Sequence, residues 1–304
     1  MCGNSTKRIL YIYPGKKNRL MKKSILAAVF ATAGLTLLNA QAPFPSAAEI
    51  KQFMESKTCV VLEDDPFSAW NPNIREAVNS FWNVTPYEFI SIVEFNKRRT
   101  DPAYSFIVLT QTHFERDKTG GLFNFINLIQ GKRVANLSDN PEICAVPLSF
   151  AGEEDITYGY KLGAILAFMQ NHARLISENP SVTGRRYLRY YNINAPEVVK
   201  KTILAKAEDM APGLSTESAI KSIYPFPFKL VEEEEIEKAI KEKAPSTLIL
   251  HKVGPTDDRT GSYCFKILIG TDDSEMYYFG QHRISQGNPN AFLDSDLKRL
   301  ARYK

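Results

Sequence analysis

Histidine and cysteine are scarce in this chain of 304 residues, which has four of each. No two histidines are spaced to bind a metal together on one helix or strand, and no CxxC pair is present. The sequence also contains no GxSxG, HExxH, GxxxxGK(S/T) or GxGxxG motif. The common signatures of hydrolases, metalloproteases and nucleotide-binding enzymes are therefore absent, and we expect neither a metal nor a cofactor.

A long apolar run is missing as well. Residues 25–38 are apolar, but a membrane-spanning helix needs about 18 or more such residues. The run follows Lys22 and Lys23 and precedes Ala40-Gln41-Ala42, a small-x-small sequence typical of signal-peptide cleavage. We expect cleavage near Ala42, a periplasmic or secreted protein, and no transmembrane span in the mature chain. Residues 1–42 are then an upstream extension and a signal peptide.

The basic charge of the chain belongs to this leader. The formal net charge is +4, but residues 1–42 carry seven basic residues and no acidic one, which leaves −3 (4 − 7) for residues 43–304. A mildly acidic protein lacks the basic surface that nucleic-acid binding requires. We therefore expect no nucleic-acid partner.

Three cysteines, Cys59, Cys144 and Cys264, remain after the leader is removed. Because their number is odd, the sequence does not imply a disulfide framework, although one pair could still form. Cys59 and Cys264 lie in apolar, strand-like runs, where buried and unreactive thiols are usual.

Five short segments recur in the same order in the second half of the chain. They are 57–64 with 201–209, 77–82 with 219–224, 86–90 with 227–231, 94–95 with 235–236, and 117–120 with 258–261. The last three pairs share one offset, and the others need small gaps where loops are expected. The sequence therefore predicts a tandem duplication.

Each copy alternates between strand-like and helix-like segments. We expect strands at 59–62, 87–90, 105–110 and 122–129, with helices at 73–82 and from 94. The second copy matches with strands at 202–205, 228–231, 247–252 and 263–269, and helices at 216–224 and from 233. Strands separated by helices indicate a partly parallel sheet, which here ends in an antiparallel hairpin. The predicted fold class is α/β, with two tandem β-α-β-α-β-β units, each a small mixed sheet with flanking helices.

One further helix links the copies. Residues 158–178 place an apolar stripe at helical spacing, and the helix should stop before Asn179-Pro180. His172 lies on the apolar side of this stripe, where a packed, hydrogen-bonded histidine is expected rather than a ligand. The predicted domains are residues 43–180, the first repeat with its linking helix, and residues 181–304, the second repeat.

Acidic residues follow the first strand of each copy, as Glu63-Asp64-Asp65 and as Glu208-Asp209. Ligands of open α/β sheets bind beyond the carboxyl ends of the strands, so these carboxylates could hold a divalent cation or act as acid and base. The alternative is a solvated loop that caps the next helix, which is the interpretation we favour.

An Asp-(Lys/Arg)-Thr-Gly element precedes the last strand of each copy. It could form a backbone nest for an anion. The favoured interpretation is a hairpin turn in which Gly120 and Gly261 adopt positive φ and Asp117 and Asp258 bond the local backbone.

Arginine and tyrosine alternate in residues 185–191, between the two predicted domains. Both residue types are favoured at binding surfaces, and ligand sites tend to form at domain junctions. A linker with partly packed side chains is the structural alternative. The predicted binding residues are Arg185, Arg186, Tyr187, Arg189 and Tyr190.

The mature region resembles uncharacterised exported bacterial proteins built from paired α/β units. The resemblance rests on the runs at 61–67, 85–89 and 168–172, and it implies export and fold but no activity. The leading hypothesis is a non-enzymatic exported protein that binds a cell-envelope protein or a small ligand. The alternative is a metal-assisted hydrolase that uses the carboxylates after the first strands.

The cleavage site gives a direct prediction. Because the small-x-small sequence ends at Ala42, the exported protein should begin at Pro43. Intact-mass analysis of the secreted or periplasmic protein checks this. A mature species that still contains residues 25–38 would contradict it.

Overall fold

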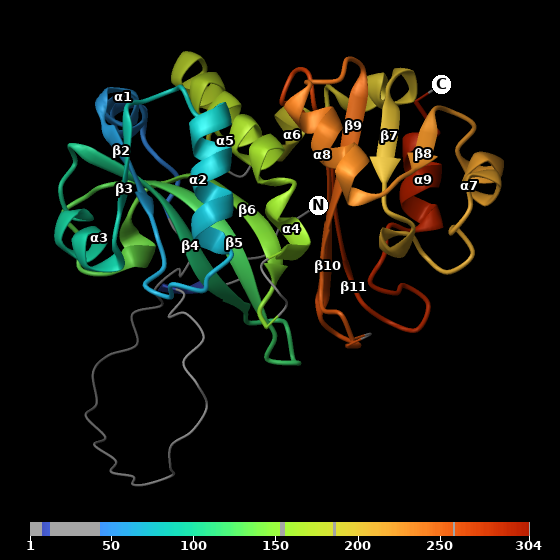
Figure 1. Cartoon of the computed structure of the whole chain (residues 1–304), viewed down its shortest axis with the longest axis horizontal. Helices are drawn as coiled ribbons and strands as arrows, with labels where there is room; N and C mark the ends of the chain where they lie inside the picture. Colours follow the sequence, from blue (N-terminus) through green and yellow to red (C-terminus); the bar gives the residue numbers. More distant parts are fainter. Residues whose placement is uncertain (1–7, 13–42, 153–155, 185–186, 258, 304) are drawn as a thin grey trace, which may run out of the picture.

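The computed structural model describes residues 8–12, 43–152, 156–184, 187–257 and 259–303. Two sheets stand next to one another along the long axis of the molecule, and helices flank them on their outer sides and between them (Figure 1). The α/β class and the two similar units are therefore confirmed.

The first sheet has the strand order β3-β2-β4-β5-β6, and β1 also pairs with β4. Its strands are β1 (Arg8–Ile12), β2 (Lys57–Val61), β3 (Tyr87–Ile90), β4 (Tyr104–Phe114), β5 (Leu122–Gln130) and β6 (Glu142–Phe150). Strands β3 and β4 run parallel to β2, whereas β4, β5 and β6 are successively antiparallel.

The second sheet repeats this arrangement with the order β11-β10-β9-β7-β8. Its strands are β7 (Thr202–Ala205), β8 (Phe228–Leu230), β9 (Thr247–Val253), β10 (Tyr263–Gly270) and β11 (Met276–Arg283). The first strand again lies between two parallel neighbours, and an antiparallel hairpin extends one edge.

Each unit has one strand more than the sequence predicts, because β6 and β11 extend the expected hairpins. Strand β6 contains Pro147, which argues against a central strand but is tolerated at a sheet edge. Strand β11 is buried mainly in its first half and partly exposed in its second, so its sequence lacks the usual apolar–polar period of two. The unit is therefore β-α-β-α-β-β-β.

The helices lie close to where the sequence places them. They are α1 (Ala47–Glu55), α2 (Trp70–Phe81), α3 (Ile92–Arg98), α4 (Ile156–Gly159), α5 (Leu162–Glu178), α6 (Tyr187–Tyr191), α7 (Glu217–Ile223), α8 (Glu233–Lys241) and α9 (Asp294–Leu300). Helix α1, which the sequence analysis missed, begins with a capping box between Ser46 and Glu49. Thr216 caps α7 as expected.

Helix α5 joins the cores of the two units. Leu162, Ile165 and Met169 belong to one buried cluster with Leu128 of the first sheet and Ile267 of the second. The helix contacts α1, α2, β6, α8 and β10. It lies between the two halves of the molecule in Figure 1. One hydrophobic cluster thus runs through both units, and each unit also has a buried cluster of its own on the other face of its sheet.

Cys59, Cys144 and Cys264 are free and buried. Burial raises the pKa of Cys59 to about 11 and also that of Cys264 to about 11, which keeps both thiols protonated and unreactive. Within the described ranges, no helix combines the length and apolar composition needed to cross a membrane.

The two glycine turns contact each other across the units. Gly120 and Gly261 have φ values of 69° and 97°, and Asp117 Oδ1 accepts a hydrogen bond of 2.8 Å from the Thr119 amide. The other oxygen of Asp117 accepts a 2.8 Å bond from the Ser262 hydroxyl of the second turn. The hairpin-turn interpretation is confirmed for both glycines, whereas Asp258 lies outside the described residues.

These turns predict the effect of two substitutions. Gly120→Val and Gly261→Val should each lower the free energy of unfolding by about 1–2 kcal/mol, because a β-branched residue is strained at positive φ. Gly287→Val is the matched control, since an added Cβ there meets open space and the φ is not in the left-handed region. Urea denaturation measures the three variants, and equal stability would contradict the assignment.

Candidate functional site

The predicted Arg/Tyr segment is only partly described. Arg185 and Arg186 lie outside the described residues, and Tyr187 begins α6. Arg189 is exposed, whereas Tyr190 packs edge-on against Tyr191. Binding by this segment stays a prediction.

The last residue of the segment, Tyr191, is packed in the core. The Tyr191 hydroxyl lies 2.8 Å from His172 Nδ1, and both residues are buried. Burial lowers the pKa of His172 to about 4, so this histidine is neutral near pH 7. The expectation of a packed, hydrogen-bonded His172 is confirmed.

The acidic cluster of the first copy orders its own loop. Glu63 accepts a hydrogen bond from the Ser68 hydroxyl, and Ser68 in turn accepts a 3.1 Å bond from the Trp70 amide. Asp65 accepts a 2.9 Å bond from the Phe67 amide. These carboxylates therefore order the loop before α2, but α2 begins without a side-chain cap, so the expectation that they cap the next helix is wrong.

The acidic cluster of the second copy differs, and the expectation that it caps the next helix is wrong. Glu208 and Asp209 lie in the 3₁₀ helix η4 (Ala207–Asp209), and α7 is capped by Thr216 instead. Asp209 is buried, and its carbonyl oxygen accepts a 2.7 Å hydrogen bond from the Phe292 amide. This contact fixes the loop so that the carboxylate is held among lysines.

Asp209 borders a cavity of about 470 Å³ between the two units, which we call the interdomain pocket. The first unit contributes β6 and the residues around α4, and the second contributes the ends of β7 and β9 and the start of α8. These elements face one another in the middle of Figure 1. The pocket lies beyond the carboxyl ends of β7 and β9, where ligands of α/β sheets bind.

Two lysines share the Asp209 carboxylate inside the pocket. Lys161, which immediately precedes α5, lies 3.7 Å from Asp209 Oδ2, and Lys252 of β9 lies 3.6 Å from Oδ1. Both distances exceed the 2.7–2.9 Å or so of a charge-assisted hydrogen bond. One carboxylate therefore balances two ammonium groups, and neither pairing is tight.

The charge of a third lysine is balanced by two glutamates. Lys206 is paired with Glu208 and with Glu233 of α8. Its burial opposes protonation, but hydrogen bonds to the two glutamates raise its pKa above the ordinary value. The Glu208 side chain is 71% exposed, so water screens its charge.

Burial lowers the pKa of two basic residues deep in the pocket, Lys161 and His251. Desolvation lowers the pKa of Lys161, and the negative charge of Asp209 offsets only part of this effect. Burial lowers the pKa of His251 to about 3, and the positive charge of Lys161 acts in the same direction. His251 is therefore a neutral imidazole across the physiological range.

Two buried acceptors in the pocket have no hydrogen-bond partner in the described part of the chain: His251 Nδ1 and Asn290 Oδ1. His251 Nε2 lies 2.8 Å from the Pro147 carbonyl oxygen, which can only accept, so Nε2 carries the proton and Nδ1 is an acceptor. Asn290 Nδ2 donates to the Pro255 carbonyl at 2.5 Å, which leaves Oδ1 as an acceptor. An unpaired buried acceptor costs about 1–3 kcal/mol, so a bound donor here would be stabilised.

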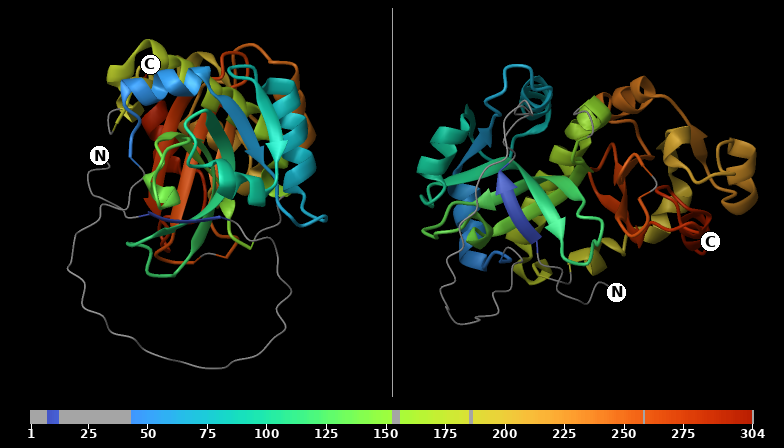
Figure 2. Two further views of the ribbon diagram at one scale, coloured as in Figure 1. Left: turned by 90° about the vertical axis from the view of Figure 1, so that its left-hand side faces the viewer. Right: turned by 90° about the horizontal axis from the view of Figure 1, so that it is seen from below.

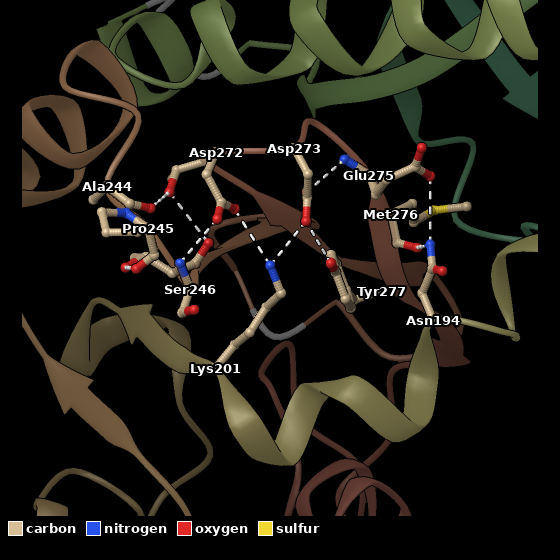
Figure 3. Close-up of polar contacts among 12 residues, drawn as sticks. Asn194, Lys201, Ala244, Pro245, Ser246, Asp272, Asp273, Glu275, Met276 and Tyr277 are labelled. Carbon is tan, nitrogen blue, oxygen red and sulfur yellow. Dashed lines mark hydrogen bonds and ion pairs between the residues drawn. The ribbon is translucent and has the colours of Figure 1, made fainter.

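A second charged network is self-contained (Figure 3). Lys201 binds Asp272 at 3.3 Å and Asp273 at 2.8 Å, and Asp273 also accepts a bond from Tyr277. Glu275 accepts a 2.8 Å bond from Asn171 of α5. This network ties the β10–β11 turn to the linking helix, and its groups bind each other rather than a ligand.

Comparison with protein-family models, with curated proteins and with solved structures gives no match. In the described residues, no group of three or more histidine, cysteine, aspartate or glutamate side chains could hold a metal ion. The site must therefore be interpreted from its own residues, and these provide ammonium groups and hydrogen-bond acceptors.

The sequence analysis singled out Glu208-Asp209 but missed Lys161, His251 and Asn290. These residues lie in three different elements, and no local spacing connects them. A basic residue directly before the apolar helix was the only available signal, and single surface lysines are too common for such a signal to be informative.

Burial of neutral His251 predicts a pH dependence of stability. The unfolded histidine has a pKa near 6.5, whereas the folded value is about 3. Between these values the unfolded state binds more protons, so stability is complete above about pH 6.5 and falls as the pH drops toward 3. His251→Gln should reduce the stability loss between pH 7 and pH 5 by about 2 kcal/mol.

Denaturation at pH 7 and pH 5 measures this difference. His113→Gln is the control, because His113 is a partly exposed histidine of β4. If His251→Gln and the parent chain lose the same stability on acidification, the assigned buried neutral state is wrong.

Proposed function

We propose that the chain is an exported, non-enzymatic binding protein whose interdomain pocket takes a small hydroxylated anion. The predicted signal peptide supports export, and the pocket supports the ligand class. A sugar acid, an aldonic acid or a sugar phosphate has this chemistry.

The charge balance inside the pocket carries the proposal. The side chains of Lys161, Lys252 and Asp209 are only 4%, 15% and 10% exposed, so two ammonium groups face one carboxylate away from bulk water. The glutamates that pair with Lys206 are 71% and 40% exposed and are screened by solvent. An anionic group placed between the lysines would supply the missing negative charge in a region of low dielectric.

The two unpaired acceptors favour a ligand that also carries hydroxyl groups. His251 and Asn290 line the pocket, and a small shift of their side chains would let the buried His251 Nδ1 and Asn290 Oδ1 accept hydrogen bonds from ligand hydroxyl groups. The volume of about 470 Å³ falls within the roughly 300–1,000 Å³ typical of small-molecule pockets. The net charge of −3 in residues 43–304 does not favour a nucleic acid.

The experiment compares ligands that differ in one feature. D-Glucuronate, D-gluconate and glycerol 3-phosphate provide hydroxyl groups and an anion, glucose and glycerol lack the anion, and acetate lacks the hydroxyl groups. At least one hydroxylated anion should raise the melting temperature and bind in calorimetry at least about tenfold more tightly than the matched neutral compound and acetate.

The variants identify the pocket as the binding site. Lys161→Met and Lys252→Met should each weaken binding about tenfold or more, whereas Lys298→Met, which removes an exposed lysine of α9, should have no effect. Lys161→Met should also retain the fold, because Lys252 still balances the Asp209 carboxylate when the Lys161 charge is removed. Equal binding of neutral and anionic compounds, or undiminished binding by both pocket variants, would refute the proposal.

A further inference from the structure

Strand β4 has two different partners along one edge. Residues Lys57–Val60 of β2 pair in parallel with Tyr104–Ile107, the first part of β4. Farther along, β1 pairs antiparallel with β4, from Arg8 opposite Phe114 to Ile12 opposite Thr110. Because β5 pairs with β4 from Ser105 to His113 on the opposite edge, β1 and β2 must share this one. Figure 2 shows the short dark-blue strand beside the green β4.

The arrangement arises because β4 is longer than its parallel neighbour. Strand β4 has 11 residues, whereas β2 has 5 and is followed by the loop that leads to α2. Residues 110–114 therefore extend beyond β2 and present backbone N–H and C=O groups, which β1 pairs. We call these residues the β4 acceptor edge.

Strand β1 belongs to the segment that the predicted cleavage after Ala42 removes. The mature protein would then expose five residues of sheet edge, a feature that natural proteins usually shorten, twist away or cover. Short peptides commonly bind such edges by adding one strand to the sheet. The pairing of residues 8–12 demonstrates that this edge accepts an antiparallel strand of that length.

We infer that the β4 acceptor edge is a docking site for an extended segment of a partner protein, which adds antiparallel to β4 after the leader is removed. The chain's own residues 8–12 occupy the same site beforehand. The inference rests on the predicted cleavage, and it is independent of the ligand proposed for the interdomain pocket.

The edge also defines what the partner segment must contain. It needs about five residues without proline, because proline cannot donate to the ladder. Its side chains would lie next to Gln111 and His113 on one face of the sheet, and next to Thr110 and Thr112 on the other. Thr112 Oγ1 is buried and has no hydrogen-bond partner within the described ranges. A serine, threonine or asparagine opposite Thr112 would therefore be favoured.

The test uses the full chain with β1 weakened. Leu10→Pro combined with Tyr11→Pro removes two adjacent N–H groups, and one of them must point toward β4, because successive amides of a strand point to opposite edges. Exchange of the amides in residues 110–114 that point toward β1 should be slow in the parent chain and at least tenfold faster in the variant, whereas the amides that point toward β5 should stay protected. A labelled peptide of residues 7–13 should restore the protection.

Peptide affinity gives the second measurement. The double-proline chain should bind the peptide at least tenfold more tightly than the parent chain, whose own strand competes at high effective concentration. The control is the same peptide with prolines at positions 10 and 11, which should not bind. Leu10→Gly combined with Tyr11→Gly repeats the test in case the proline variant fails to fold.

Three results would overturn the inference. Slow exchange of the amides that point toward β1 in both double variants would mean that the edge is covered without β1. Fast exchange without peptide binding would mean that the edge does not accept a strand from outside. A variant that dimerises and regains protection without peptide would identify a second copy of this chain as the occupant.

Discussion

The burial of helix α5 on more than one side is the constraint on which the rest of the molecule depends. Twelve of its 17 residues are buried, so its apolar surface extends well beyond the single stripe of an ordinary surface helix. Such a helix needs neighbours on several faces, and the two sheets supply them through Leu128 and Ile267. The duplicated units are therefore held against each other, and their loops meet at fixed positions.

The position of α5 also explains why the two copies differ in function. Lys161 precedes the helix and is carried into the boundary between the units, where Asp209 of the second copy meets it. In the first copy, Glu63 of the corresponding acidic cluster accepts a hydrogen bond from Ser68 of its own loop. The corresponding loop thus orders its own residues in one unit and lines a pocket in the other.

Charged groups are buried in two ways in the second unit, and the contrast favours a ligand at the pocket. Lys266 and Asp296 form a tight pair in the core, and the Tyr278 hydroxyl donates to the same carboxylate. Lys161 and Asp209 are also buried and Lys252 is largely so, yet their ion pairs are long and neighbouring acceptors lack partners among the described residues. Incomplete compensation of buried charge lowers stability, and a bound anion with hydroxyl groups would relieve it.

The sequence by itself determined the α/β class, the duplication, the linking helix and the two glycine turns. These features depend on local patterns, such as apolar periodicity and the need for positive φ at Gly120 and Gly261. Only the tertiary structure decided that β6 and β11 complete the sheets, since Pro147 and the lack of apolar–polar alternation in β11 hide both strands from pattern analysis. The tertiary structure also placed Lys161 near Lys252 and paired β1 with β4. These contacts join residues that are distant along the chain, so no periodic pattern in the sequence indicates them.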